Sequence, residues 1–166
     1  GNNGREINDT DFSFAPAYYA QQLPGMLSVG ASDATPSGSS NGPSDACHFS
    51  NFSTTYVDLF APGCDSSLRD SGILSTGWPD LEPVPDDYVY MSGTSMSAPH
   101  VAAAASYVFA YLYEKSGIYP TNTLVEEILK ASARSQANLE SYTLLGRHLD
   151  MKSLLQYINS EVLVDP

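Results

Sequence analysis

The chain has 166 residues, which is enough to bury the core of one domain. It carries 19 acidic against 7 basic residues, a net charge of −12, and such a surface repels nucleic acid and anionic membranes. No apolar run approaches the roughly 20 residues that a membrane-spanning helix needs. We therefore expect a globular domain that binds neither nucleic acid nor a membrane.

The predicted elements alternate between strands and helices along the chain. Short apolar runs bounded by turn-forming residues predict strands over residues 25–32, 56–63, 72–76 and 88–93. Helices are predicted over residues 95–115, 124–134 and 150–161, with Gly117 ending the first and Thr121 or Thr123 capping the second. The first helix is so rich in alanine and aromatic residues that we expect it to be buried on most faces. Strands that alternate with helices indicate an α/β fold with a parallel sheet.

Ser95 stands among small residues where the long helix is predicted to begin. A helix N-terminus offers backbone N–H groups and a partial positive charge, which would stabilise an oxyanion beside a serine nucleophile. Serine is also an ordinary helix cap. Position alone leaves both interpretations open.

The surrounding string favours the nucleophile. Residues 93–102, GTSMSAPHVA, resemble the nucleophile motif of the subtilisin-like serine proteases, the subtilases, at nearly every position. The resemblance continues in the expected order through GNNG, LPGMLSVGASD, CHFSNFSTTYVDLFAPG, ILST and LLGRHLD, where His148 replaces a usual glycine. It covers most of the chain and implies that Ser95 is the catalytic nucleophile.

The resemblance also implies a fold and a reaction. The fold is a subtilisin-like doubly wound parallel sheet of the α/β class, of which residues 1–166 are the C-terminal half and which an N-terminal half completes. The reaction is peptide-bond hydrolysis through an acyl-enzyme on Ser95, with the Asn2 amide and the Ser95 backbone N–H donating to the oxyanion. Without the resemblance, Asn2 would be interpreted as part of a simple turn. The residues implied to border the substrate pocket are Asn3, Phe14, Ser92, Gly93 and Thr94.

A serine nucleophile needs a histidine base and an aspartate. The family motifs that carry them, H-G-T and D-[ST]-G, are absent from this sequence, and in the family a histidine at the place of His100 is structural. His48 and His148 lie in other segments, so the base and the aspartate are expected in the N-terminal half. That half is either a separate polypeptide, supplied in trans or cut from the same precursor, or sequence missing here.

Two other functions are considered. A catalytically inactive subtilase-like module is the main alternative, although an inactive site has no chemical need for the intact serine motif. An unrelated serine hydrolase is disfavoured because the sequence lacks G-x-S-x-G after a strand. The expected partners of the protease are a peptide or protein substrate and a propeptide or protein inhibitor. Its expected location is secreted or extracellular.

Calcium is the expected cofactor, in a structural role. The resemblance implies that it would bind through the carbonyl groups of Pro24 and Met26 and the carboxylate of Asp58, and such oxygen ligands suit a hard cation. The alternative interpretation, which is equally strong, is that Asp58 only forms hydrogen bonds that hold a loop. The acidic run at 80–87 is a further candidate, although a solvated loop is the stronger interpretation.

The two cysteines, Cys47 and Cys64, leave two possibilities open. They form either one disulfide or two buried thiols. They flank segments that the resemblance makes neighbours in the fold, and a disulfide would suit a secreted protease.

Overall fold

The computed structural model describes residues 1–10, 13–34, 45–66, 72–77 and 88–163. Its strands are β1 (Val29–Asp33), β2 (Leu59–Cys64), β3 (Ile73–Thr76), β4 (Tyr88–Met91), β5 (Arg134–Ser135) and β6 (Arg147–His148). Its α-helices are α1 (Thr94–Ser116), α2 (Asn122–Ser132) and α3 (Met151–Tyr157), and shorter helical turns span Ala17–Gln22, Ala137–Leu139, Leu144–Gly146 and Ile158–Val162. All the predicted strands and helices are therefore present, with shifted ends.

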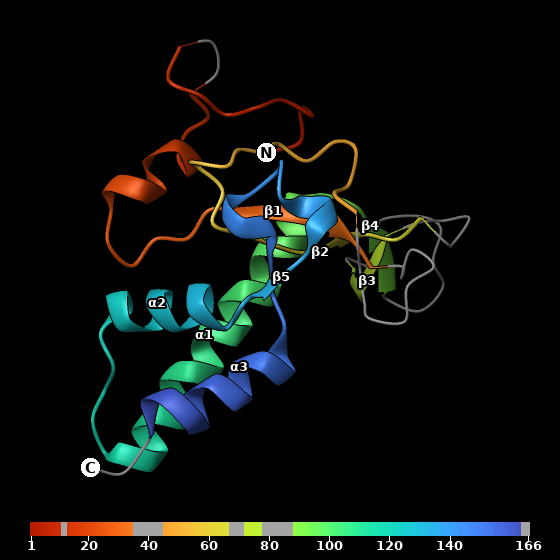
Figure 1. The fold of residues 1–166 in the computed structure, drawn as a ribbon. Coiled ribbons are helices and arrows are strands. Elements are labelled where there is room, and N and C mark those ends of the chain that lie inside the picture. The colour runs from red at the N-terminus through yellow and green to blue at the C-terminus, as the bar shows by residue number, and fades with distance from the viewer. Residues whose placement is uncertain (11–12, 35–44, 67–71, 78–87, 164–166) are drawn as a thin grey trace.

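The main sheet has the strand order β1-β2-β6-β5. β1 is parallel to β2 and β2 to β6, whereas β5 is antiparallel to β6. The predicted α/β class with a largely parallel sheet is thus confirmed, and the antiparallel strand β5 was not predicted. β3 and β4 form a separate antiparallel pair at one side of the molecule (Figure 1). Among the described residues, no helix is long and apolar enough to cross a membrane.

The main sheet is covered on both faces, which explains the continuous apolar run in β2. Leu59 and Ala61 pack against α1, α2 and α3 in one buried cluster. Phe60 lies between them in the chain and packs in a second cluster with Ile7 and Leu139. Successive side chains of a strand point to opposite faces. In Figure 1 the three helices accordingly lie below the sheet and the N-terminal segment above it.

Helix α1 carries the residues that the sequence singled out, at its first turn. It runs across β1 and β2, and its buried positions recur every three or four residues: Ser97, Val101, Ala104, Val108 and Leu112. The prediction of burial on most faces is therefore wrong for this chain as it stands, since only one stripe of α1 is covered. The helix ends at Gly117, whose left-handed backbone (φ 71°) is the conformation glycine tolerates best.

The two following helices begin at side-chain caps. Thr121 accepts a hydrogen bond from the Leu124 N–H at 3.2 Å, which settles the choice between Thr121 and Thr123. Asp150 accepts from the N–H groups of Lys152 and Ser153 and so begins α3. These caps fix where α2 and α3 begin.

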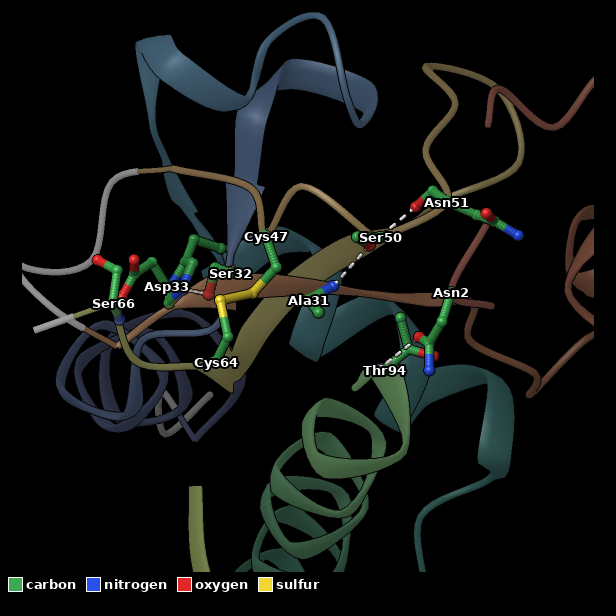
Figure 2. Close-up of a disulfide and its surroundings, with 11 residues drawn as sticks. Asn2, Ala31, Ser32, Asp33, Cys47, Ser50, Asn51, Cys64, Ser66 and Thr94 are labelled. Atoms are coloured by element: carbon green, nitrogen blue, oxygen red, sulfur yellow. Dashed lines mark hydrogen bonds between the residues drawn. A yellow bond between two sulfur atoms is a disulfide. The ribbon is translucent and has the colours of Figure 1, made fainter. Parts of the chain in front are cut away.

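A disulfide joins Cys47 to Cys64. Cys64 ends β2, and Cys47 lies on the segment that runs beside β1 (Figure 2). Of the two possibilities for these cysteines, the structure therefore has the disulfide.

Candidate active site

Ser95 is the second residue of α1 and its side chain is exposed. The helix begins at Gly93, whose carbonyl accepts from the Met96 N–H at 3.0 Å. Gly93 is itself anchored to the end of β2, because its N–H donates to the Gly63 carbonyl at 2.8 Å. The strand end thus presents the first turn of α1, with Ser95 at the surface and its backbone N–H at the helix N-terminus, where such groups lack intrahelical partners.

Asn2 lies against this helix start, although 92 residues separate it from α1 in sequence. Its side-chain Oδ1 accepts two hydrogen bonds from Thr94, one from the backbone N–H at 3.0 Å and one from the hydroxyl at 2.9 Å (Figure 2). Because Oδ1 is engaged on Thr94, the orientation of the amide is fixed. Its Nδ2 group can then donate a hydrogen bond to an acceptor other than Thr94.

The two expected oxyanion donors meet at Gly93. A methyl carbon built on Gly93 would lie 3.1 Å from Asn2 Nδ2 and 3.7 Å from the Ser95 backbone nitrogen. The two nitrogens therefore lie near the same point at the start of α1, and Met96 Sδ lies 3.8 Å from that point. Two donors to one oxyanion must lie close together in this way.

The residues expected to border the pocket are only partly gathered here. Thr94 holds Asn2, and Gly93 leaves space beside it, while Ser92 is exposed just before them. The Asn3 side chain is exposed, and its N–H donates to Asn51 Oδ1 at 2.9 Å. The half-buried Phe14 packs with the second cluster, and its ring lies against Gly1, so it is adjacent to the Asn2 turn. Their contact with a substrate stays a prediction.

The three histidines are engaged elsewhere. His100 Nδ1 bonds to the Met96 carbonyl one turn back on α1, at 2.7 Å. The buried His148 bonds through Nε2 to the Ser32 hydroxyl and through Nδ1 to the Leu149 carbonyl, each at 2.8 Å. Burial lowers the pKa of His148 below its ordinary value. The exposed His48 packs edge-on against Phe49. That the base for Ser95 comes from the N-terminal half stays a prediction.

The candidate calcium ligand Asp58 already has protein partners. Its carboxylate, buried to 2% exposure, pairs with the Lys130 ammonium at 2.8 Å. It also accepts from Gln21 Nε2 at 2.8 Å and from the Ser28 N–H at 2.7 Å. Burial would lower the pKa of Lys130, but its hydrogen bonds to Asp58 and Glu126 outweigh this effect and raise that pKa. A buried carboxylate needs such a partner.

As it is paired in this structure, Asp58 does not fit a divalent cation, because the Lys130 ammonium occupies the carboxylate that would bind it. The bonds match the other expectation for Asp58, that it holds a loop. Among the described residues, no cluster of three or more His, Cys, Asp or Glu side chains could hold a metal. The acidic run at 80–87 lies outside the described residues. Calcium binding through Pro24, Met26 and Asp58 stays a prediction, and it requires Lys130 to give up its ion pair.

Two residues of the site were not anticipated in the roles they have. Thr94 was expected to border the pocket, and it also orients Asn2. Lys130 was not singled out, although its spacing of four residues from Glu126 on a helix is a recognisable ion-pair signal. Its pairing with Asp58 depends on the fold and has no local signal.

The sequence profile of the Subtilase family matches residues 1–147. A curated relative, the thermophilic serine proteinase of Bacillus sp. (strain AK1), is 37% identical over 106 residues. That match covers 64% of this chain and 19% of the relative. The chain thus spans about a fifth of the length of this relative.

Solved structures of similar fold cover most of the chain. A cold-adapted subtilisin-like serine proteinase has 28% identity and a TM-score of 0.57 over 90% of this chain and 42% of that chain. A lanthipeptide protease has 22% identity and a TM-score of 0.66, covering 96% of this chain and 49% of its own. The A-subunit of the AB5 toxin from E. coli has 22% identity and a TM-score of 0.68, and the match covers 94% of this chain and 48% of the toxin subunit. The chain therefore matches about half of each of these folds.

Proposed function

Because this chain belongs to the subtilase family, we propose that it forms the nucleophile-bearing half of a serine endopeptidase. Ser95 attacks the carbonyl carbon of the scissile peptide bond and forms an acyl-enzyme, which water then hydrolyses. Asn2 Nδ2 and the Ser95 N–H hold the oxyanion of each tetrahedral intermediate. A histidine from the N-terminal half takes the hydroxyl proton of Ser95 and gives it to the leaving amine, and an aspartate orients that histidine.

The observation that carries this proposal is the proximity of Asn2 Nδ2 and the Ser95 backbone nitrogen to the same point beside Gly93. A serine that served only as a helix cap would not need the Asn2 amide held beside it by Thr94. The exposure of Ser95 adds support, since a nucleophile must meet its substrate. The same features disfavour a catalytically inactive binding module, which remains the second candidate.

An apolar groove supports the assignment of an N-terminal half as the partner. The groove has a volume of about 700 Å³ and lies between α1, α2 and the residues leading into β1. Its walls include Leu27, Val29, Ala102, Ala105 and Phe109. An apolar surface of this kind is unusual unless another element covers it. The solved relatives are about twice as long as this chain, so we assign the groove to the N-terminal half.

Further features of the whole protease are proposed from the same family membership. Peptides or proteins are its substrates, and a propeptide or protein inhibitor can occupy its cleft. We also propose that it is secreted, because the Cys47–Cys64 disulfide suits an oxidising compartment.

The proposal is tested by producing this chain together with an N-terminal half and measuring hydrolysis of a peptide library. Ser95→Ala should abolish turnover while the two halves still assemble. Ser97→Ala is the matched control, because the Ser97 hydroxyl is buried and has no hydrogen-bond partner among the described residues. Ala102→Arg should prevent assembly by filling the groove with a charge. Hydrolysis by the Ser95→Ala protein would refute the proposal, and so would a wild-type assembly without activity.

A further inference from the structure

The turn that carries Asn2 is held mainly by one neighbouring segment, residues 47–52. The side-chain Oδ1 of Asn51 accepts from the N–H groups of Asn3, at 2.9 Å, and Arg5, at 3.3 Å. The Asn51 N–H donates to the Gly1 carbonyl at 2.8 Å. Asn51 therefore binds the turn on both sides of Asn2.

Asn51 is itself fixed to the main sheet. Only 2% of its surface is exposed. The neighbouring Ser50 hydroxyl donates to the Asn51 carbonyl and accepts from the Ala31 N–H of β1, each at 2.9 Å (Figure 2). The Cys47 N–H donates to the Ala31 carbonyl at 2.8 Å. The position of the Asn2 turn thus depends on β1 through Ser50 and Asn51.

The same segment is joined to the start of α1 by a second route. The disulfide links Cys47 to Cys64 at the end of β2, and the adjacent Gly63 carbonyl accepts from the Gly93 N–H at 2.8 Å. The two sides of the oxyanion hole therefore rest on one connected frame. Donors of this kind must be held to within about 0.5 Å to be effective.

We propose that Asn51 is a positioning residue of the oxyanion hole, whose side-chain carbonyl holds the Asn2 turn so that Asn2 Nδ2 stays beside the Ser95 N–H. This inference rests on the proposed protease function. Asn51 does not touch the substrate and acts through Asn2. Without its Oδ1, two N–H groups of the turn lose their acceptor, while the Gly4 N–H still donates to the Phe49 carbonyl at 2.7 Å. The turn would remain but would be less exactly placed.

The test compares two substitutions in the assembled protease. Asn51→Leu removes the acceptor at similar volume and should lower kcat about 10- to 100-fold with KM changed less than about threefold, because the oxyanion forms only after binding. Asn51→Asp keeps the acceptor oxygen and replaces Nδ2, which is buried without a hydrogen-bond partner among the described residues, by a second oxygen. Because a carboxylate at this buried position costs stability, the variant should recover kcat only in part, to at least about threefold above Asn51→Leu.

A double-mutant cycle separates positioning from a general structural role. In an Asn2→Ala background, Asn51→Leu should lower kcat less than about threefold further, because the donor that it positions is already absent. Active sites are titrated with a fluorophosphonate, so that kcat refers to folded enzyme. Losses that multiply in the double variant would overturn the inference, as would an unchanged kcat in Asn51→Leu. If the leucine variant does not assemble, Asn51→Ala takes its place in the same cycle.

Different results would contradict the protease function and the role of Asn51. A wild-type assembly that neither hydrolyses peptides nor reacts with the fluorophosphonate contradicts the protease function itself. An active wild type whose kcat is insensitive to Asn51→Leu contradicts only the role of Asn51.

Discussion

Asn2 accepts two hydrogen bonds from Thr94 through a single side-chain oxygen. The contact joins the first residues of the chain to the first turn of α1, one residue before Ser95. It fixes which end of the Asn2 amide faces Thr94 and leaves the N–H₂ end beside Gly93. The chemical competence that we assign to Ser95 depends on this contact.

Replacing Asn2 by aspartate should therefore be severe. Aspartate keeps an oxygen for Thr94 but puts a second, negatively charged oxygen where the donor stood. Loss of the corresponding donor in subtilisin lowers kcat by about 10²–10³-fold, a value taken over here from that enzyme. We expect at least such a loss for Asn2→Asp and a loss of this size for Asn2→Ala, with KM little changed. Steady-state kinetics of the assembled protease check this, and a variant of normal kcat would rule out Asn2 as a donor.

Lys130 should make the Asp58 region insensitive to calcium. Lys130→Met leaves the buried Asp58 without its cation and should lower the free energy of unfolding by about 3 kcal/mol. It should also open Asp58 to an added cation, so that calcium raises the unfolding temperature of this variant more than that of wild type. Lys152→Met, at an exposed position of α3, is the matched control. Equal calcium responses in wild type and Lys130→Met would contradict this role for Lys130.

His148 should make the fold sensitive to acid. Because burial lowers its pKa, the unfolded chain binds a proton at mildly acidic pH more readily than the folded chain does. Stability from this group is present above the unfolded pKa of about 6.5 and falls as pH decreases below it. The nearby Arg134 lowers this pKa further, whereas Asp150 and the bond to Leu149 oppose the shift.

The measurement is the free energy of unfolding of the assembled protease between about pH 7.5 and 5. It should fall toward acid in wild type and fall less steeply in His148→Gln, which can still bond to Ser32 but does not titrate. Identical slopes in the two proteins would show that His148 does not contribute.

Removing the disulfide should destabilise the protein without removing the nucleophile. Cys47 and Cys64 are 17 residues apart, and a loop of this size predicts a loss of about 3 kcal/mol when both are replaced by serine. Denaturant unfolding of the assembled protease measures the loss. An unchanged midpoint would mean that Ser50 and the strand contacts fix this segment without the covalent bond.

The local features of the chain were predictable because their signals are local. Strand β2, a helix beginning near Ser95 and a cap at Thr121 or Thr123 follow from apolar runs and turn or cap residues, and the structure then places the N-cap residues at Gly93 and Thr121. The site contacts were accessible only through the family resemblance, since no short-range pattern brings Asn2 to Thr94.

Long-range polar pairs were not predictable. Asp58 and Lys130, and likewise Ser32 and His148, meet only because the sheet brings distant segments together. The antiparallel placement of β5 has the same cause, since a strand of two residues carries too little pattern to reveal its partner. Asn51 lies in a segment that resembles the family, but only the fold brings it to the Asn2 turn.

The most direct measurement is to locate the covalent adduct of a fluorophosphonate on the assembled protease by peptide mass spectrometry. We predict one adduct on Ser95, which disappears in Ser95→Ala and persists in Ser97→Ala. An active protease that carries the adduct on another residue, or none, would contradict the account.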